Sequence, residues 1–134
     1  MTKIALIEDN PDNRLLVEAM LEEFYQVVQF EDGPSALKGL PGADTELILL
    51  DISLPGMDGL EVLKHLKEMP ETAHQPVIAL TAHAMSGDRE RFLGAGFDAY
   101  LSKPILDTDH LTDLIDRLLS QAKTPTPTDD DAEP

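Results

Sequence analysis

The sequence contains no cysteine, and its ten lysine and arginine residues are outnumbered by 26 aspartate and glutamate residues. Without cysteine the chain forms no disulfide, no thiolate nucleophile and no cysteine-ligated zinc site. A formal net charge of −16 at pH 7 repels nucleic acid and anionic membranes, so we expect neither as a direct partner. The same charge favours cations and basic partner surfaces, and it also aids solubility.

The chain also lacks a long apolar run and a signal-peptide pattern near Met1. Because a membrane-spanning helix needs about 20 predominantly apolar residues, we expect a cytoplasmic protein that does not cross a membrane. A length of 134 residues fits one domain. The apolar fraction of 42% is ordinary for a chain that folds around a core.

Five segments predict β-strands that are separated by helical segments. Three of them are almost continuous apolar runs, which are typical of parallel strands buried on both faces. The predicted strands are residues 3–7, 27–30, 47–50, 76–81 and 99–102. Strands that alternate with helices form βαβ units, so the pattern predicts an α/β fold with a parallel sheet and right-handed crossovers.

The segments between and after these strands predict five helices. Asn10 is a suitable cap for a first helix with Pro11 at its first position, followed by apolar residues at helical spacing. Those residues are Leu15, Leu16, Ala19 and Met20. Further helices are expected near residues 34–40, 60–66 and 88–93, the last capped by Ser86. The clearest amphipathic helix contains Leu111, Leu114, Ile115, Leu118 and Leu119.

Residues 123–134 differ in composition from the rest of the chain. Threonine and proline alternate from Thr124 to Thr128, and four carboxylates follow at Asp129, Asp130, Asp131 and Glu133. This segment has no apolar residue large enough to pack. We therefore expect one domain over residues 1–122 and a disordered acidic tail over residues 123–134.

Polar side chains stand where the predicted strands end. Glu8 and Asp9 follow the first strand, Asp51 the third and Thr81 the fourth, and Lys103 comes shortly after the fifth. In an open parallel sheet, ligands bind outside the carboxyl ends of the strands. We therefore expect these five residues, which are distant in sequence, to form one site.

Charge repulsion restricts what such a site can be. Two like unit charges about 4 Å apart repel by roughly 4 kcal/mol at an effective dielectric constant near 20. Three carboxylates therefore need a cation or protonation. A divalent cation is the simpler answer, and Mg²⁺ (or Mn²⁺) suits an oxygen-ligand site that receives a phosphate. With a positive charge from Lys103 and a hydroxyl donor from Thr81, the predicted site is suited to phosphoryl transfer to a carboxylate.

Several short motifs occur together at these strand ends. They are Glu8-Asp9-Asn10, the apolar strand ending in Asp51, Leu-Pro-Gly-Met-Asp-Gly at residues 54–59, Thr81-Ala82, and Tyr100 three residues before Lys103-Pro104. Over about residues 3 to 120 the sequence resembles the receiver domains of bacterial two-component response regulators. It is especially similar to stand-alone receivers of cell-cycle phosphorelays.

The resemblance implies a fold and a set of site residues. The fold is a flavodoxin-like doubly wound sheet of five parallel strands in the order 2-1-3-4-5, with two helices on one face and three on the other. Asp51 accepts a phosphoryl group from a histidine, assisted by Lys103 and Thr81. Asp9, Asp51 and the backbone carbonyl of Ser53 bind the metal directly, and Glu8 binds it through water.

The resemblance also implies how the signal is used. Thr81 and Tyr100 form the switch, and the Lys103–Pro104 bond is cis. From its position two residues after Thr81, and not from the resemblance, we expect His83 to edge the site as a bystander that modulates phosphate lifetime. The phosphodonor is a histidine kinase or a histidine phosphotransfer protein. A downstream target binds the face formed by the fourth helix, fifth strand and fifth helix, or the phosphoryl group is passed onward. The domain assists only its own phosphorylation and dephosphorylation and is otherwise not an enzyme.

Other readings of the acidic site fit the sequence less well. A haloacid-dehalogenase type of phosphohydrolase needs a second aspartate two positions after Asp51, where Ser53 stands. A nucleotide- or flavin-binding domain needs a glycine-rich loop after the first strand, where Glu8-Asp9-Asn10-Pro11 stands. A phosphorylation-independent scaffold has no use for an intact acidic site.

Overall fold

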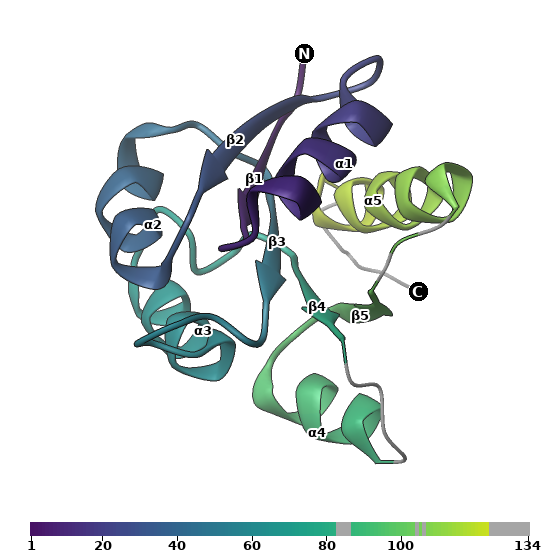
Figure 1. The fold of residues 1–134 in the computed structure, drawn as a ribbon. Helices are drawn as coiled ribbons and strands as arrows, with labels where there is room; N and C mark the ends of the chain where they lie inside the picture. Colours follow the sequence, from purple (N-terminus) through teal and green to yellow (C-terminus); the bar gives the residue numbers. More distant parts are fainter. Residues whose placement is uncertain (83–86, 104, 106, 124–134) are drawn as a thin grey trace, which may run out of the picture.

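The computed structural model describes residues 1–82, 87–103, 105 and 107–123. Its centre is a sheet of five parallel strands in the order β2-β1-β3-β4-β5 (Figure 1). The strands are β1 (Lys3–Ile7), β2 (Gln26–Phe30), β3 (Leu47–Asp51), β4 (Val77–Thr81) and β5 (Ala99–Ser102). The helices are α1 (Pro11–Leu21), α2 (Gly33–Gly39), α3 (Gly59–Glu68), α4 (Asp88–Ala95) and α5 (Thr108–Lys123), with a short 3-10 helix, η1 (Leu40–Gly42), after α2. The predicted α/β fold and strand order are confirmed.

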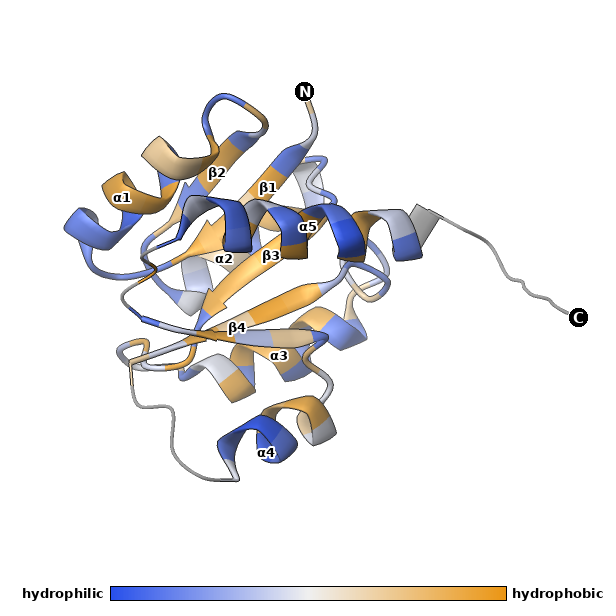
Figure 2. Ribbon diagram, turned by 90° about the vertical axis from the view of Figure 1, so that its right-hand side faces the viewer, coloured by the Kyte–Doolittle hydropathy of each residue, from blue (hydrophilic) through white to orange (hydrophobic). Residues whose placement is uncertain are grey.

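Each face of the sheet has its own apolar core, because successive strand side chains point to opposite faces. On one face, Ile4, Leu6, Leu49 and other strand residues pack against α1 and α5. On the other face, alternate residues of the same strands pack against α2, α3 and α4. Figure 2 shows the apolar strands between the two layers of helices. Fully burying one leucine or isoleucine side chain stabilises the fold by about 1.5–3 kcal/mol.

The strand order places the carboxyl ends of the central strands next to each other. The chain passes from β1 to β2 on one side and then returns to β3 on the other, so β1 lies between them. Ile7 is paired with Leu50, and Asp51 with Leu80. The residues that follow β1 and end β3 therefore lie at the same level of the sheet, at the topological switch point where open α/β sheets bind ligands.

Helix α1 begins as predicted but presents a different face to the sheet. The Asn10 side chain accepts hydrogen bonds from the backbone N–H groups of Asp12 and Asn13, which satisfies two free donors of the first turn. Val17 and Leu21, four residues apart, are the buried residues of the helix. Leu15 and Leu16 are 66% and 40% exposed, because the stripe defined by Val17 and Leu21 points them away from the core.

Helices α4 and α5 differ in extent from the predictions. Gly87, with φ of 90°, takes the cap position of α4 without a side-chain cap, and the helix runs to Ala95. The expected cap Ser86 lies outside the described residues, as do His83, Pro104 and residues 124–134. Helix α5 continues through Lys123, one residue into the segment predicted as tail, and the five apolar residues that predicted it are buried.

The close contact at Gly59 yields a first prediction. A Cβ atom at Gly59 would lie 2.7 Å from the backbone oxygen of Asp51 and 2.7 Å from Cα of Ile52. Gly59→Ala must displace the backbone beside Asp51, so we expect it to lower the free energy of unfolding by about 1–3 kcal/mol in urea titrations. Gly42→Ala is the control, since no atom lies within 4 Å of its Cβ position. Equal stability of the two variants would contradict the steric argument.

Candidate functional site

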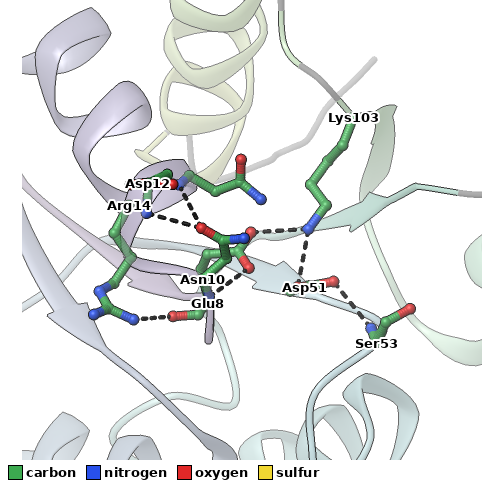
Figure 3. A network of polar contacts seen from close by, with 8 residues as sticks. Glu8, Asn10, Asp12, Arg14, Asp51, Ser53 and Lys103 are labelled. Carbon is green, nitrogen blue, oxygen red and sulfur yellow. Dashed lines mark hydrogen bonds and ion pairs between the residues drawn. The ribbon is translucent and has the colours of Figure 1, made fainter.

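Three charged side chains meet at the carboxyl end of the sheet (Figure 3). The Lys103 ammonium group donates to Glu8 Oε1 at 2.9 Å and to Asp51 Oδ2 at 3.0 Å. The side chains of both carboxylates are 1% exposed, and that of Lys103 is 15% exposed. Removing one partner of such a buried ion pair costs about 3–5 kcal/mol, because the remaining charge is left without compensation. Lys103 thus provides the positive charge that the two buried carboxylates require.

The backbone around Glu8 is held by three hydrogen bonds. The Glu8 N–H donates to the carbonyl of Phe30 at 3.0 Å, which continues the pairing of β1 with β2. The Arg14 guanidinium donates to the Glu8 carbonyl at 2.7 Å, and the Asn10 N–H donates to Glu8 Oε2 at 3.2 Å. This contact of Arg14 was not predicted, because nothing in the sequence indicates that a basic residue on the first helix reaches back to the end of the preceding strand.

Asp51 and Lys103 are held in the same way by the backbone. The Ser53 N–H donates to Asp51 Oδ1 at 2.9 Å, so one carboxylate oxygen is fixed by the loop after β3 and the other by Lys103. The Lys103 N–H donates to the carbonyl of Thr81 at 2.7 Å, which joins the loop after β5 to the end of β4. Loops from three strands therefore fix the orientation of these side chains before any ligand binds.

Burial and charge shift the protonation of two of these groups. Burial first, and then the neighbouring Asp51, raise the pKa of Glu8 to about 7, although Lys103 and the Asn10 N–H act in the opposite direction. For Lys103, burial acts to lower the pKa, but the hydrogen bonds and charges of Glu8 and Asp51 outweigh it and raise the pKa. Lys103 is therefore a permanent cation near neutral pH, whereas Glu8 is close to its titration midpoint.

The geometry of the carboxylates suits one divalent cation. One oxygen from each of Glu8, Asp9 and Asp51 lies within 4.8 Å of the others, and Asp9 is exposed whereas the other two are buried. A Mg²⁺ ion takes its oxygen ligands at about 2.0–2.1 Å, so the three oxygens must approach one another to hold an ion between them. These residues fit a Mg²⁺ site that opens to solvent beside Asp9.

The two predicted switch residues lie on the β4–β5 side of the site. Thr81 ends β4, is buried, and is paired with Ser102 of β5. Tyr100 lies one strand further out, and its ring centroid is 6.2 Å from that of Phe92 on α4. The structure thus places Thr81 at the edge of the charged group and Tyr100 against α4, outside the network of Glu8, Asp51 and Lys103.

A family model for the response regulator receiver domain matches residues 4–116. The chain belongs to the response-regulator receiver family. The receiver is 45% identical over 107 residues to the polar-differentiation response regulator DivK of Brucella ovis, covering 78% of this chain and 87% of DivK. It is 43% identical over 106 residues to the signal transduction histidine-protein kinase BarA of Escherichia coli K12. That match covers 78% of this chain but only 11% of BarA.

Solved structures agree with this assignment. The receiver domain of the sensor histidine kinase PA1611 from Pseudomonas aeruginosa has a TM-score of 0.80 and 36% identity, covering 89% of this chain and 98% of that one. Its structure contains a magnesium ion coordinated in the active site cleft. The signal receiver domain of a histidine kinase from Syntrophus aciditrophicus has a TM-score of 0.81 and 32% identity, covering 98% and 99%. Within the described part of the receiver, no helix is both long and apolar enough to span a bilayer.

The raised pKa of Glu8 yields a second prediction. When a carboxyl group has a higher pKa in the folded protein than its ordinary value of 4.5, its bound proton stabilises the fold. This contribution is complete below pH 4.5 and is lost as the pH rises through about 7. In metal-free buffer, we therefore expect wild-type stability relative to Glu8→Gln to fall by on the order of 1–3 kcal/mol between about pH 5 and pH 8. Urea unfolding across this range, with chelator, measures the difference.

The control for this measurement is Glu22→Gln, because Glu22 is exposed at the end of α1. Removing this exposed charge should change the free energy of unfolding by no more than about 0.5 kcal/mol. A Glu8→Gln profile that runs parallel to wild type would show that the folded protein does not hold a proton on Glu8.

Proposed function

We propose that the receiver takes a phosphoryl group from a phosphohistidine onto Asp51. The observation that supports this most directly is the placement of one Asp51 oxygen against the Ser53 N–H and the other against Lys103, beside Glu8 and Asp9. An Asp51 oxygen attacks phosphorus, the bond from phosphorus to the histidine nitrogen breaks, and an aspartyl phosphate forms. The electron pair of the broken bond stays on the histidine nitrogen.

Each charged residue has a separate task in this step. Lys103 moves from Glu8 and Asp51 toward a phosphoryl oxygen, where its ammonium offsets the added charge. Asp9, Asp51 and the Ser53 carbonyl are the proposed direct ligands of Mg²⁺ or Mn²⁺, with Glu8 bound through water. A divalent cation held there supplies charge neutralisation at the transferring phosphoryl oxygens. The Thr81 hydroxyl donates to another phosphoryl oxygen.

Receiver domains are signalling modules, and they interact with histidine kinases and downstream targets. We infer that this one catalyses only its own phosphorylation and dephosphorylation, because the acceptor carboxylate is part of the site itself. We propose a cytoplasmic location, where kinases and phosphotransfer proteins supply phosphohistidine. The phosphoryl group then either activates binding to a target or is passed on to another histidine.

The phosphodonor is proposed to dock beside α1. Leu15 and Leu16 are exposed apolar residues on this helix, and Leu16 lines a small hollow together with Glu8 and Lys103. A donor helix that covers these leucines brings its phosphohistidine to the edge of the site while burying apolar surface. His83, which is proposed as a modulator of phosphate lifetime, lies outside the described residues.

The downstream partner is proposed to bind the face formed by α4, β5 and α5. Helix α4 is short, has Phe92 as its buried residue, and is flanked by Gly87 and Gly96 in left-handed conformations. Elements with few buried contacts are the ones that shift most readily. Tyr100 on β5 contacts this helix through Phe92, so a movement of Thr81 toward the phosphate changes the packing beneath α4.

A third prediction tests the acceptor. Incubation with acetyl phosphate or phosphoramidate and Mg²⁺ should add one acid-labile phosphoryl group to the wild type, measured by intact mass. Asp51→Asn should reduce the rate at least about 100-fold, because the amide is a poor nucleophile. Asp44→Asn is the matched control, since Asp44 is exposed and its φ of 57° suits asparagine. Unchanged labelling of Asp51→Asn would mean that another residue is the acceptor.

A fourth prediction tests the switch. Thr81→Ala should still be phosphorylated, because the Thr81 hydroxyl is not the nucleophile, but it should lose the protein's response to phosphate. Amide hydrogen exchange before and after addition of the phosphodonor should change at residues 87–100 in wild type and much less in Thr81→Ala. Ser102→Ala, at the paired position of β5, is the control. Equal changes in Thr81→Ala and wild type would rule out this route for the signal.

A further inference from the structure

Two hollows adjoin α5, one beside α4 and β5 and the other beside the end of α3 and the segment before β4. One has a volume of about 190 Å³ and is lined by Arg89, Leu93, Tyr100, His110, Leu114 and Arg117, among others. The other has a volume of about 240 Å³, and its lining includes Lys67, His74, Leu118 and Gln121. Asp98 borders both hollows, which makes them neighbouring parts of one depression.

The α5 residues that line the hollows lie on one stripe of the helix. They are His110, Leu114, Arg117, Leu118 and Gln121. These positions are separated by steps of four, three, one and three residues, which place them on one side of an α-helix. The two hollows therefore form one groove that runs along α5, with the buried side chains of Leu114 and Leu118 as its apolar floor.

The charge of this groove is opposite to that of the whole chain. The net charge is −16, yet Lys67, Arg89 and Arg117 line the groove, and Asp98 is the one carboxylate among the described lining residues. An oxygen of Asp98 already accepts the Val77 N–H at 2.8 Å. Within the described residues, the three basic side chains form no ion pair. The groove is therefore suited to an acidic segment.

We propose that this groove binds the acidic residues that follow α5 in the same chain. Helix α5 ends at Lys123, and Asp129, Asp130 and Asp131 follow after a segment in which threonine and proline alternate. The carboxylates of these aspartates pair with Arg117 and Arg89, while the threonine and proline residues pass over Leu118.

The available length permits this contact. From Gln121 back to His110 the groove covers 11 helical residues, which is about 17 Å at 1.5 Å per residue. The six residues 124–129 span up to about 20 Å when extended, so the aspartates reach the far end of the groove. Proline also favours an extended backbone, which residues 124–129 need in order to run back along α5.

Attachment to α5 compensates for the weakness of each contact. Exposed ion pairs are individually weak and are screened by salt, with a Debye length of about 8 Å at 0.15 M. A segment tethered by a short linker, however, is present at an effective concentration in the millimolar range. The aspartates therefore occupy the groove at low ionic strength and leave it at high ionic strength or when a better ligand competes.

The consequence for signalling rests on the proposed function, whereas the contact itself does not. The groove includes Tyr100 and Leu93, which lie on the face proposed for the downstream partner. Residues 129–131 therefore compete with that partner, and only a partner with sufficient affinity displaces them. The contact can be tested without phosphorylation, so a failure of Asp51 as acceptor would not affect the result.

The test compares the full chain with the variant Asp129→Asn/Asp130→Asn/Asp131→Asn by amide NMR at low salt. The signals of Tyr100, Leu101, Leu114 and Arg117 should shift in the variant, and the difference should disappear at about 0.5 M salt, where the Debye length falls to roughly 4 Å. The double variant Arg89→Glu/Arg117→Glu should lose the response to neutralisation of the aspartates.

The matched control removes three exposed carboxylates at the opposite edge of the sheet, as Glu22→Gln/Glu23→Gln/Glu31→Gln. It should leave the groove signals unchanged. Shifts in the groove no larger than those of this control would overturn the proposal, as would a response centred on α1. Shifts that grow with protein concentration would also overturn it, because they would assign the groove to the aspartates of a second copy.

Discussion

The contact of one ammonium group with two buried carboxylates governs the site. Glu8 and Asp51 come from adjacent central strands, and Lys103 comes from the loop after the edge strand, 52 residues beyond Asp51. Without Lys103, the sheet would bring two carboxylates together away from water with little compensation. If a phosphoryl group draws Lys103 away from them, a metal ion must supply positive charge in its place, which links the position of Lys103 to metal binding and to phosphate.

The sequence predicts most of the site because strand register is fixed by burial. Apolar runs that end in Glu8 and Asp51 can lie in a parallel sheet in few ways, and the carboxyl ends of neighbouring strands meet at one edge. The contacts of Arg14 with the Glu8 carbonyl and of Ser53 with Asp51 could not be predicted, because they depend on loop conformations. The exposure of Leu15 and Leu16 was also not predicted. Their spacing is compatible with a helix, but it does not show which side of α1 faces the core.

Charge is distributed unevenly over the molecule. Acidic residues dominate the composition, yet basic side chains border the α5 groove and Lys103 lies inside the acidic site. A strongly acidic chain repels acidic partners at long range, so each basic region acts only on groups that are already close. This favours acidic ligands whose charge is offset by a nearby cation, and segments that are tethered or otherwise brought near.

The close approach of Gly59 to the peptide of Asp51 and Ile52 gives the site unequal stiffness in different directions. On the α3 side there is no space for even one additional methyl group, and on the β1 side the Phe30 and Arg14 hydrogen bonds hold the strand end in place. A group added to Asp51 therefore meets fixed neighbours on the α3 and β1 sides, which directs any displacement toward β4 and the short helix α4. The direction of the response is set by which neighbours cannot move, before any specific switch residue acts.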